Sequence, residues 1–380
     1  MNKILSGFDD ITLIPQHSSL QGRNECDISI NILNEKYDFP LVISPMCTIT
    51  TPEMIYGCYK NNIMITLHRY FNNAKEQYDY LYNGLENVML CDNEFKLIYG
   101  IDKENKNKNL TKEQIDEINH IISKTYFAVG GIKKYKEWID WLIKNNIKRY
   151  CVDMAHGDID ECINTCKYIK EQCPEAKIMS GNYALYEGVI NNPYADLYRI
   201  GISCGSCCTT ARNTGFGMPT FESLLDCRNR KENELIIADG GIKVNGDIVK
   251  SMAAYADLVM CGYLFAGTLS AGGMGYTDNF IKVDINKYNI DEIYYKSYCG
   301  MASKKAKSKI KMNGSIEGES GLVKCTGNLQ DVINNIKENL KSALAYCGAR
   351  NWHEFQSKVK YAYITSNACN EGKARLIHES

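Results

Sequence analysis

Short apolar runs alternate with polar stretches along most of the chain, and a polar or glycine-containing turn follows each run. Apolar runs of four or five residues that are bounded by turn signals are typical of strands buried on both faces. The runs that we predict as strands are 40–44, 63–67, 126–129, 149–153, 177–180, 196–200, 235–238 and 257–261.

The segments between these runs have helical periodicity. Tyr135, Trp138, Ile139 and Leu142 follow the i, i+3, i+4, i+7 spacing of a helix with one buried face. Repeated βα units predict an α/β fold, and eight of them favour closure into a (β/α)₈ TIM barrel over a doubly wound open sheet. A final amphipathic helix is expected over 331–346, with the last residues, from about 368, frayed.

The residues with chemical potential cluster at the predicted strand ends, where a barrel carries its active site. These ends read Ser44-Pro45-Met46, His68-Arg69, Gly130-Gly131, Asp153, Gly181-Asn182, Gly201 to Cys208, Asp239-Gly240-Gly241 and Gly262-Tyr263. This regularity is our main reason for preferring the barrel.

Two segments fall outside the eightfold pattern. We interpret residues 75–124, which include a Lys- and Asn-rich run, as a small exposed insertion, and residues 267–330 as a mobile flap over the strand ends. The prediction is one catalytic domain over residues 1–380, with an N-terminal extension before the barrel and C-terminal helices after it.

Composition limits the function classes. Hydrophobic residues make up 44% of the chain and charged residues 23%, and the net charge is −1 with both signs interspersed. These values predict a cytoplasmic globular protein that binds neither nucleic acid nor membrane. The 17 cysteines are scattered through apolar segments, so most should be buried and reduced.

The segment from Arg199 to Gly217 is the most informative. It leaves a strand through Gly201 and presents Ser206, Cys208 and Thr210. Backbone N–H groups beside a cysteine favour its thiolate, the nucleophilic form. The alternative interpretations are a structural cysteine and, for 204–207, a C-x-x-C zinc half-site that lacks a partner pair at zinc-ribbon spacing.

A second element is an apolar strand that ends in Asp239, Gly240 and Gly241. Its carboxylate could accept two ribose hydroxyls and its glycines could let amides approach a phosphate, although a helix cap would have the same residues. The next strand ends in Gly262-Tyr263, and phosphate loops on the last two strands recur in barrels. We therefore favour a nucleotide ligand. Glu317 is either a surface carboxylate or a proton-transfer group.

Taken in order, these residues resemble the IMP dehydrogenase/GMP reductase family over almost the whole chain. The matching motifs are Phe8-Asp-Asp-Ile-Thr-Leu-Ile-Pro15, Ser44-Pro-Met46, Gly205-Ser-x-Cys-x-Thr210, Ala238-Asp-Gly-Gly241, Gly262-Tyr-Leu-Phe-Ala266, Gly300-Met301 and Glu317-Gly318.

The resemblance implies a role for each matched position. Cys208 would attack carbon 2 of a purine nucleotide monophosphate, and Thr210 and Glu317 would handle the proton. The substrate would contact Ser44, Met46, Ser206, Asp239, Gly241, Gly262, Tyr263, Gly300, Met301 and Gly318. Asp153, Asn182 and Gly201 would contact a nicotinamide cofactor. No metal site is expected beyond a monovalent cation such as K⁺ near Gly205 and Cys208, and the family's tetramers imply a homotetramer.

Within the family, the reductase branch fits better. Dehydrogenases of the family resemble one another in carrying an Arg-Tyr pair that activates water, and the sequence has no such pair between Tyr298 and Glu317. The segment 75–124 is also too short to contain CBS-type regulatory modules. We expect NADPH-dependent conversion of GMP to IMP and ammonia. The alternatives are IMP oxidation to XMP with NAD⁺, reduction of a modified or deoxy purine nucleotide, and an inactive nucleotide-binding homologue.

The chain departs from the reductase pattern at four places. Ala211 stands in place of an arginine, Ser203-Cys204 in place of a Gly-rich pair, Cys47 in place of an aspartate, and Gly314 in place of a flap arginine. The change at Ser203-Cys204 affects the expected cation site. The other three changes affect which purine the enzyme would accept.

Overall fold

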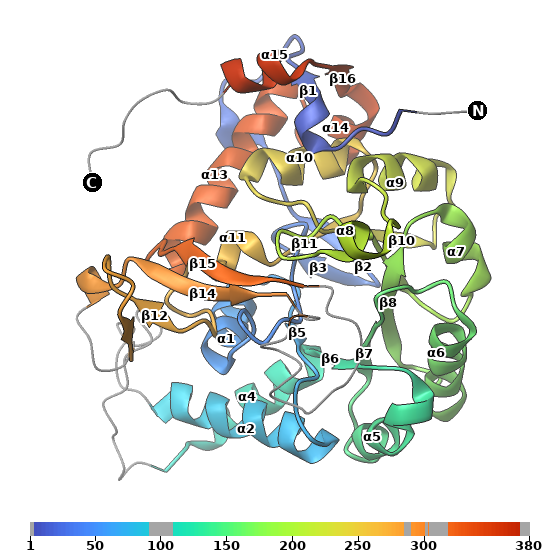
Figure 1. Cartoon of the computed structure of the whole chain (residues 1–380), viewed down its shortest axis with the longest axis vertical. Helices are drawn as coiled ribbons and strands as arrows, with labels where there is room; N and C mark the ends of the chain where they lie inside the picture. Colours follow the sequence, from blue (N-terminus) through green and yellow to red (C-terminus); the bar gives the residue numbers. More distant parts are fainter. Residues whose placement is uncertain (1–3, 91–108, 285–289, 301–302, 304–317, 373–380) are drawn as a thin grey trace.

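The protein folds around an eight-stranded parallel sheet that closes on itself (Figure 1). The computed structural model describes residues 4–90, 109–284, 290–300, 303 and 318–372. The strands, in spatial order, are β4 (Leu41–Ile43), β11 (Leu258–Cys261), β10 (Leu235–Asp239), β9 (Leu197–Ile200), β8 (Lys177–Tyr183), β7 (Arg149–Asp153), β6 (Tyr126–Val129) and β5 (Thr66–Leu67). A parallel bridge between Val42 and Met64 joins the two ends of this order, so the predicted barrel is confirmed.

Helices cover the outside of the sheet (Figure 1). They are α1 (Pro52–Lys60), α2 (Ala74–Leu90), α4 (Lys112–Lys124), α5 (Ile132–Lys144), α6 (Asp160–Gln172), α7 (Tyr186–Asn191), α8 (Thr210–Thr214), α9 (Thr220–Asp226), α10 (Asn245–Ala253) and α11 (Tyr263–Ala266). The predicted stripe of α5 is buried, from Tyr135 to Leu142. The long helices thus turn their apolar faces to the strands, as the sequence periodicity indicated, whereas the short α8 buries no residue.

The segment 75–124 differs from the expected exposed insertion at both of its ends. Helix α2 buries Leu81 and Leu85, and α4 buries Ile118, Ile121 and Ile122. The two helices pack on each other and form the crossover from β5 to β6. The Lys- and Asn-rich composition of the middle obscured the apolar spacing on either side, and residues 91–108 lie outside the described part.

The flap segment is also more regular than its weak periodicity suggested. Its described residues form an antiparallel sheet of β12 (Gly275–Tyr276), β13 (Lys282–Val283), β14 (Tyr295–Cys299) and β15 (Ser320–Lys324), drawn orange in Figure 1. Two of these strands have only two residues, too few to show an alternating pattern.

The chain ends pack on one side of the barrel. The predicted last amphipathic helix is α13 (Leu329–Cys347), which packs against α10 and is followed by α14 (Trp352–Lys358). Strand β1 (Ile11–Ile14) pairs with β16 (Lys360–Tyr363). A short helix, α15 (Ser366–Glu371), occupies part of the segment that we expected to be frayed.

The inside of the barrel is arranged in three levels along the strands. Alternate residues point inward because side chains in a strand alternate between faces. The middle level is apolar and includes Cys151, Met179, Leu197 and Ile237. Charged side chains lie on either side of it, with Arg149 and Lys177 where strands begin and Asp153, Arg199 and Asp239 toward their finish.

A hairpin covers the end of the barrel where the strands begin. Strands β2 (Ile30–Ile32) and β3 (Glu35–Tyr37) place Ile32 and Tyr37 against the apolar interior. Glu35 binds Lys124, Arg149 and Lys177, which precede or begin three barrel strands. The hairpin therefore closes the apolar interior at this end, and Glu35 and Lys124 also border a pocket of about 480 Å³.

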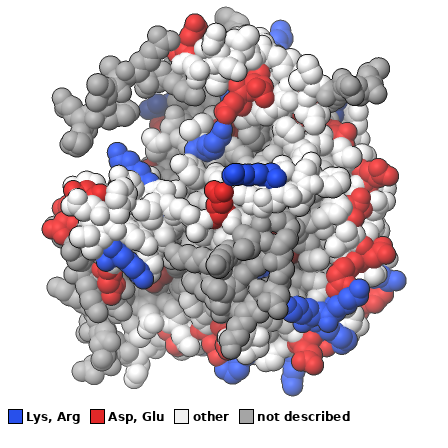
Figure 2. Space-filling model, in the orientation of Figure 1, with Lys and Arg blue, Asp and Glu red and all other residues white. Residues whose placement is uncertain are grey.

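Positive and negative side chains are intermixed on the face shown in Figure 2. Among the described residues, no helix has the length and apolar character needed to cross a membrane.

Candidate active site

A cavity of about 360 Å³ opens at the end of the barrel where the strands finish. Its walls include residues that follow β4, β5, β7, β8, β9 and β10, together with Tyr298 and Gly300 from the flap. The predicted residues that line it are Ser44, Met46, Asp153, Asn182, Gly201, Ser206, Cys208, Thr210, Asp239 and Gly300. The structure thus brings together side chains that lie up to about 250 positions apart in the sequence.

The loop after β9 presents Cys208 to this cavity. The thiol lies 3.2 Å from the hydroxyl oxygen of Thr210, and the Cys208 amide donates to the carbonyl of Gly205 over 2.8 Å. Gly201, where the loop starts, has φ +140°, and an added Cβ would lie 2.0 Å from the Asp239 carbonyl oxygen. Only glycine lets the loop leave the strand this close to β10.

The departure at Ser203 has a local structural explanation. Ser203 has φ +73°, a left-handed conformation that favours glycine. Its hydroxyl oxygen accepts a hydrogen bond of 2.7 Å from the amide of Ala211, which opens α8. The serine therefore fixes the turn that carries Cys208 to the start of this helix.

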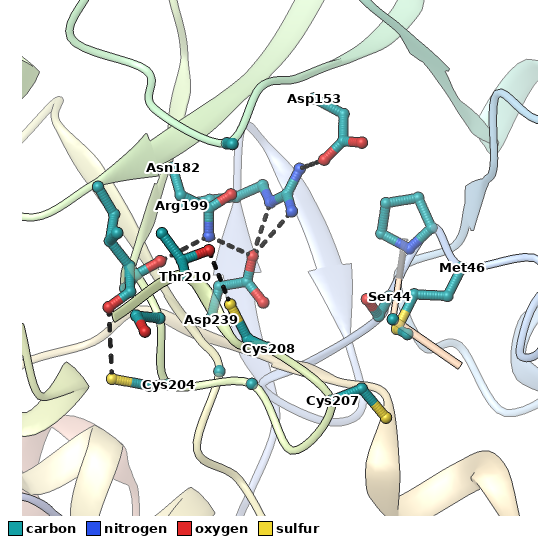
Figure 3. Close-up of a pocket in the computed structure, with 18 of the residues that line it drawn as sticks. Ser44, Met46, Asp153, Asn182, Arg199, Cys204, Cys207, Cys208, Thr210 and Asp239 are labelled. Atoms are coloured by element: carbon teal, nitrogen blue, oxygen red, sulfur yellow. Dashed lines mark hydrogen bonds and ion pairs between the residues drawn. The ribbon is translucent and has the colours of Figure 1, made fainter. Parts of the chain in front are cut away.

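The other two cysteines of the loop point elsewhere. Cys204 donates to the carbonyl of Met218 over 3.0 Å, and the Cys207 side chain points away from Cys208 (Figure 3). Burial raises the pKa of Cys204, and it raises that of Cys207 to about 12. Of the three thiols, Cys208 is the one beside a hydroxyl group in the cavity. Among the described residues, no group of three or more His, Cys, Asp or Glu side chains is arranged to hold a metal.

A buried arginine joins the two acidic residues of the site (Figure 3). Arg199, with 7% of its side chain exposed, donates through Nη1 to Asp153 over 2.8 Å and through Nε to Asp239 over 2.9 Å. Its Nη2 is 2.9 Å from the same Asp239 oxygen, Oδ2. Asn182 donates to this oxygen over 2.8 Å and to the Gly201 carbonyl over 2.9 Å.

Asp153 has a second cationic partner. Arg69 Nε lies 3.2 Å from its other oxygen, and Arg69 Nη1 donates to the Tyr135 hydroxyl over 3.2 Å. Burial alone would raise the pKa of Asp153, but Arg199 and Arg69 outweigh it and hold the pKa below its ordinary value. Asp153 is therefore a carboxylate in the folded protein at neutral pH.

The flap contacts the loop after β9, which carries Cys208, through its backbone. The amide of Glu319 donates to the Cys207 carbonyl over 2.8 Å, and the amide of Gly300 donates to the Glu319 carbonyl over 2.9 Å. Cys208 and Gly318 form an antiparallel bridge. From the same flap, the Tyr298 hydroxyl reaches the sulfur of Met46 at 3.6 Å.

The remaining predicted residues are not among those that line the cavity. Gly262 lies next to it, since an added Cβ would be 3.2 Å from the Met46 sulfur. Tyr263 is 41% exposed with its ring 6.1 Å from that of Tyr298, and Gly241 follows β10. Met301 and Glu317 lie outside the described residues.

Sequence reasoning missed Arg199 and Tyr298 and gave Arg69 no role. A signal for Arg199 was present, because it is two positions from Leu197 on a strand whose alternate residues point inward. No comparable signal marked Tyr298, which belongs to the unpredicted flap sheet.

Comparison with known proteins agrees with this arrangement. Residues 6–375 match the family model of the IMP dehydrogenase / GMP reductase domain. The chain belongs to this family. It is accordingly an oxidoreductase, and the resemblance to this family over almost the whole chain is confirmed.

Individual relatives are distant but cover the full length. The chain is 27% identical to a GMP reductase of Staphylococcus aureus (strain JH9) over 371 residues, which are 96% of this chain and 97% of that protein. It is 28% identical to a GMP reductase of Pediococcus pentosaceus over 368 residues, again 96% and 97% of the two chains. A crystal structure of a Trypanosoma brucei GMP reductase variant in complex with guanosine 5′-monophosphate shares the fold, with a TM-score of 0.80, 22% identity, and coverage of 100% of this chain and 99% of that one.

Proposed function

We propose that this enzyme is an NADPH-dependent GMP reductase that releases IMP and ammonia. The observation that carries the proposal is the Cys208 thiol, 3.2 Å from the Thr210 hydroxyl and open to a cavity that also contains Asp239. The relatives from Staphylococcus aureus and Pediococcus pentosaceus are both named GMP reductases, which favours this reaction over IMP oxidation.

The reaction begins with the Cys208 thiolate. Its sulfur forms a bond to carbon 2 of guanine, and the amino group leaves from that carbon as ammonia once it has gained a proton. Thr210 is placed to pass this proton, because its oxygen is in contact with the sulfur. We assign Glu317, which the resemblance implicates, to the same proton relay. A hydride then adds to carbon 2, the C–S bond breaks, and the thiolate is restored as IMP forms.

The nucleotide would be held mainly by strand ends. Arg199 and Asn182 contact Oδ2 of Asp239, and we assign Oδ1 to the ribose hydroxyls. Ser206, Gly241, Gly262 and Tyr263 would bind the phosphate, and Ser44, Met46, Gly300, Met301 and Gly318 would surround the base. A carboxylate already fixed in direction binds hydroxyls without further loss of side-chain freedom.

The part of the cavity next to Asp239, between Asn182 and Asp153, suits a nicotinamide ring. Asp153 and Asn182 face the cavity there with Gly201 beside them, and a volume of about 360 Å³ is within the range of small-molecule sites. When bound, NADPH supplies the hydride. The residues of this chain orient the ring against carbon 2 and exclude water from it.

The cation and the assembly are further parts of the proposal. A monovalent ion such as K⁺ would bind near Gly205 and Cys208, where the backbone turns, and the subunits would form a cytoplasmic homotetramer. Replacement of K⁺ by Na⁺ in the assay and sedimentation analysis test these two points.

Absorbance at the nicotinamide wavelength tests the reaction. The purified enzyme should oxidise NADPH in the presence of GMP and leave NAD⁺ unchanged in the presence of IMP. Reduction of NAD⁺ with IMP alone would reverse the assignment to IMP dehydrogenase. If neither pair reacts, deoxy-GMP and modified guanine nucleotides are the next substrates to supply, and silence with all of them would leave a nucleotide-binding protein without activity.

A further inference from the structure

We infer that Arg199 is the positioning residue that makes the nucleotide half and the cofactor half of the cavity one cooperative unit. The inference rests on the proposed function, since it takes Asp239 as the nucleotide contact and Asp153 as the cofactor contact. It assigns to Arg199 no contact with either ligand.

The first support is the geometry of the guanidinium. Arg199 uses one edge, Nε and Nη2, on Asp239 and uses Nη1 on Asp153. The group is planar and its five donors are fixed relative to one another, so a shift of one carboxylate must move the other. A change at Asp153 therefore reaches Asp239 through one rigid group, in addition to the hydrogen bond that Asn182 donates to Asp239.

The second support is burial. Arg199, Asp153 and Asp239 expose 7%, 12% and 13% of their side chains. Their charges are thus weakly screened by solvent, and loss of one partner would leave another charge without compensation. Separating these three side chains is therefore costly in free energy. A displacement of one carboxylate is more easily passed to the other than absorbed by breaking an ion pair.

The third support is the difference between Arg199 and Arg69. Both bind Asp153, but Arg69 donates through Nη1 to the Tyr135 hydroxyl, whereas Arg199 contacts Asp239. Arg69 therefore fixes the cofactor half alone, whereas Arg199 fixes both halves. The pair supplies a matched comparison within one site.

The test measures how NADP⁺ changes the affinity of the enzyme for GMP. These two ligands together cannot react, because NADP⁺ carries no hydride to donate. Isothermal titration of the wild type should show at least about fivefold tighter GMP binding when NADP⁺ is saturating, and the same factor in the reverse direction, as linkage requires. In Arg199→Lys the single ammonium cannot hold both carboxylates in the fork geometry. The coupling factor should fall to about one, and both ligands alone should bind more weakly.

Two controls separate coupling from general damage. Arg69→Lys should weaken NADP⁺ binding and keep the coupling factor. Arg149→Lys replaces the inward-facing arginine at the opposite end of the barrel, which binds Glu35, and should lower thermal stability without change in either affinity.

A second variant serves if Arg199→Lys fails to fold, as judged by its melting curve. Asp153→Asn removes the charge from the cofactor half, and it should weaken GMP binding measured without cofactor, because Arg199 loses one of its two anchors. Unchanged GMP affinity in Asp153→Asn, or an unchanged coupling factor in Arg199→Lys, would overturn the inference. So would a wild type that turns over GMP yet shows no coupling, whereas a wild type that neither binds nor reduces GMP would overturn the proposed function itself.

Discussion

The two ends of the barrel contain the same kinds of groups in opposite arrangements. Where the strands begin, one carboxylate, Glu35, is surrounded by Lys124, Arg149 and Lys177. Where they finish, Arg199 lies between Asp153 and Asp239. The first cluster is held by the β2–β3 hairpin, which contains Glu35 and covers the apolar interior, and the second lines the cavity that contains Cys208.

The difference shows what turns an ion cluster into a site. At the covered end three cations surround one carboxylate, and Glu35 and Lys124 border a pocket of about 480 Å³ whose described walls contain no cysteine. We therefore expect this cluster to contribute to stability. At the open end, carboxylates are fixed from behind by arginine while their front borders an opening of about 360 Å³. Charge alone does not mark function, because both ends are charged and both border a pocket. The open end is distinguished by the Cys208 thiol, which lies beside the Thr210 hydroxyl in its cavity.

The largest expected effect is at the open end, in Cys208→Ala. Loss of the nucleophile should lower kcat by at least about 10⁴-fold, since the remaining residues can only bind and orient substrate. The melting temperature should be nearly unchanged because the side chain is part of a loop. Steady-state assays with Cys207→Ser as the neighbour control, expected to lose less than about tenfold, check this; comparable losses in both would show that Cys208 has no special role.

A smaller loss of activity is expected from Thr210→Val. The variant keeps the shape of the side chain but removes the oxygen that lies 3.2 Å from the thiol, so kcat should fall by about 10²-fold as proton transfer is impaired. Thr209→Val is the matched control, because its hydroxyl contacts Asn213 and not the thiol. Equal kcat values for the two variants would contradict the role of Thr210.

The covered end should affect stability and its pH dependence. Burial opposes ionisation of Glu35, but hydrogen bonds from Lys177, Lys124 and Arg149 outweigh it and lower the pKa to about 2. A carboxyl whose folded pKa is depressed adds stability that is present above its unfolded pKa and lost as pH falls toward 2. Glu35→Gln should therefore unfold more easily by about 3 kcal/mol at pH 7, and the difference should vanish near pH 2.

Urea unfolding of both proteins across this pH range measures the Glu35 effect. Glu338→Gln is the control, since its pair with Arg23 is about half exposed and should be worth less than about 0.5 kcal/mol. The kcat of Glu35→Gln should stay at the wild-type value under stable conditions. A large fall in kcat would break the division between a structural end and a catalytic end.

The smallest effect concerns the turn of the covering hairpin. Asn34 has φ +64°, a conformation that asparagine and glycine tolerate and alanine does not. Asn34→Ala should cost about 1 kcal/mol of unfolding free energy, whereas Asn34→Gly should cost almost nothing. Thermal melts of the two variants check this, and equal losses would mean that the backbone conformation is not the cause.

Much of the barrel could be predicted because its strands are buried on both faces. Strands 126–129 and 149–153 were predicted with their observed bounds, and the run at 63–67 was found although only Thr66–Leu67 pair as a strand. The covering hairpin was missed because three-residue strands carry too little pattern.

The site was predicted from motifs at strand ends, and for this reason contacts between strands were not foreseen. Asp153 and Asp239 were expected to serve different ligands, and nothing local in the sequence shows that Arg199 binds both. Such a contact depends on barrel closure and register, which turn residues of β7, β9 and β10 toward one interior although β8 lies between β7 and β9. Periodicity gives the direction of a side chain but not its partner.

The pairing of the flap with the Cys208 loop, which follows β9, has a consequence for how this enzyme can change through evolution. Glu319 and Gly300 make their contacts with main-chain atoms, and Cys208 pairs with Gly318 in the same way. Backbone pairing does not depend on which side chains the flap carries. Mutations can therefore accumulate in the flap and change the side chains that face the purine. The position of the flap relative to Cys208 would stay the same.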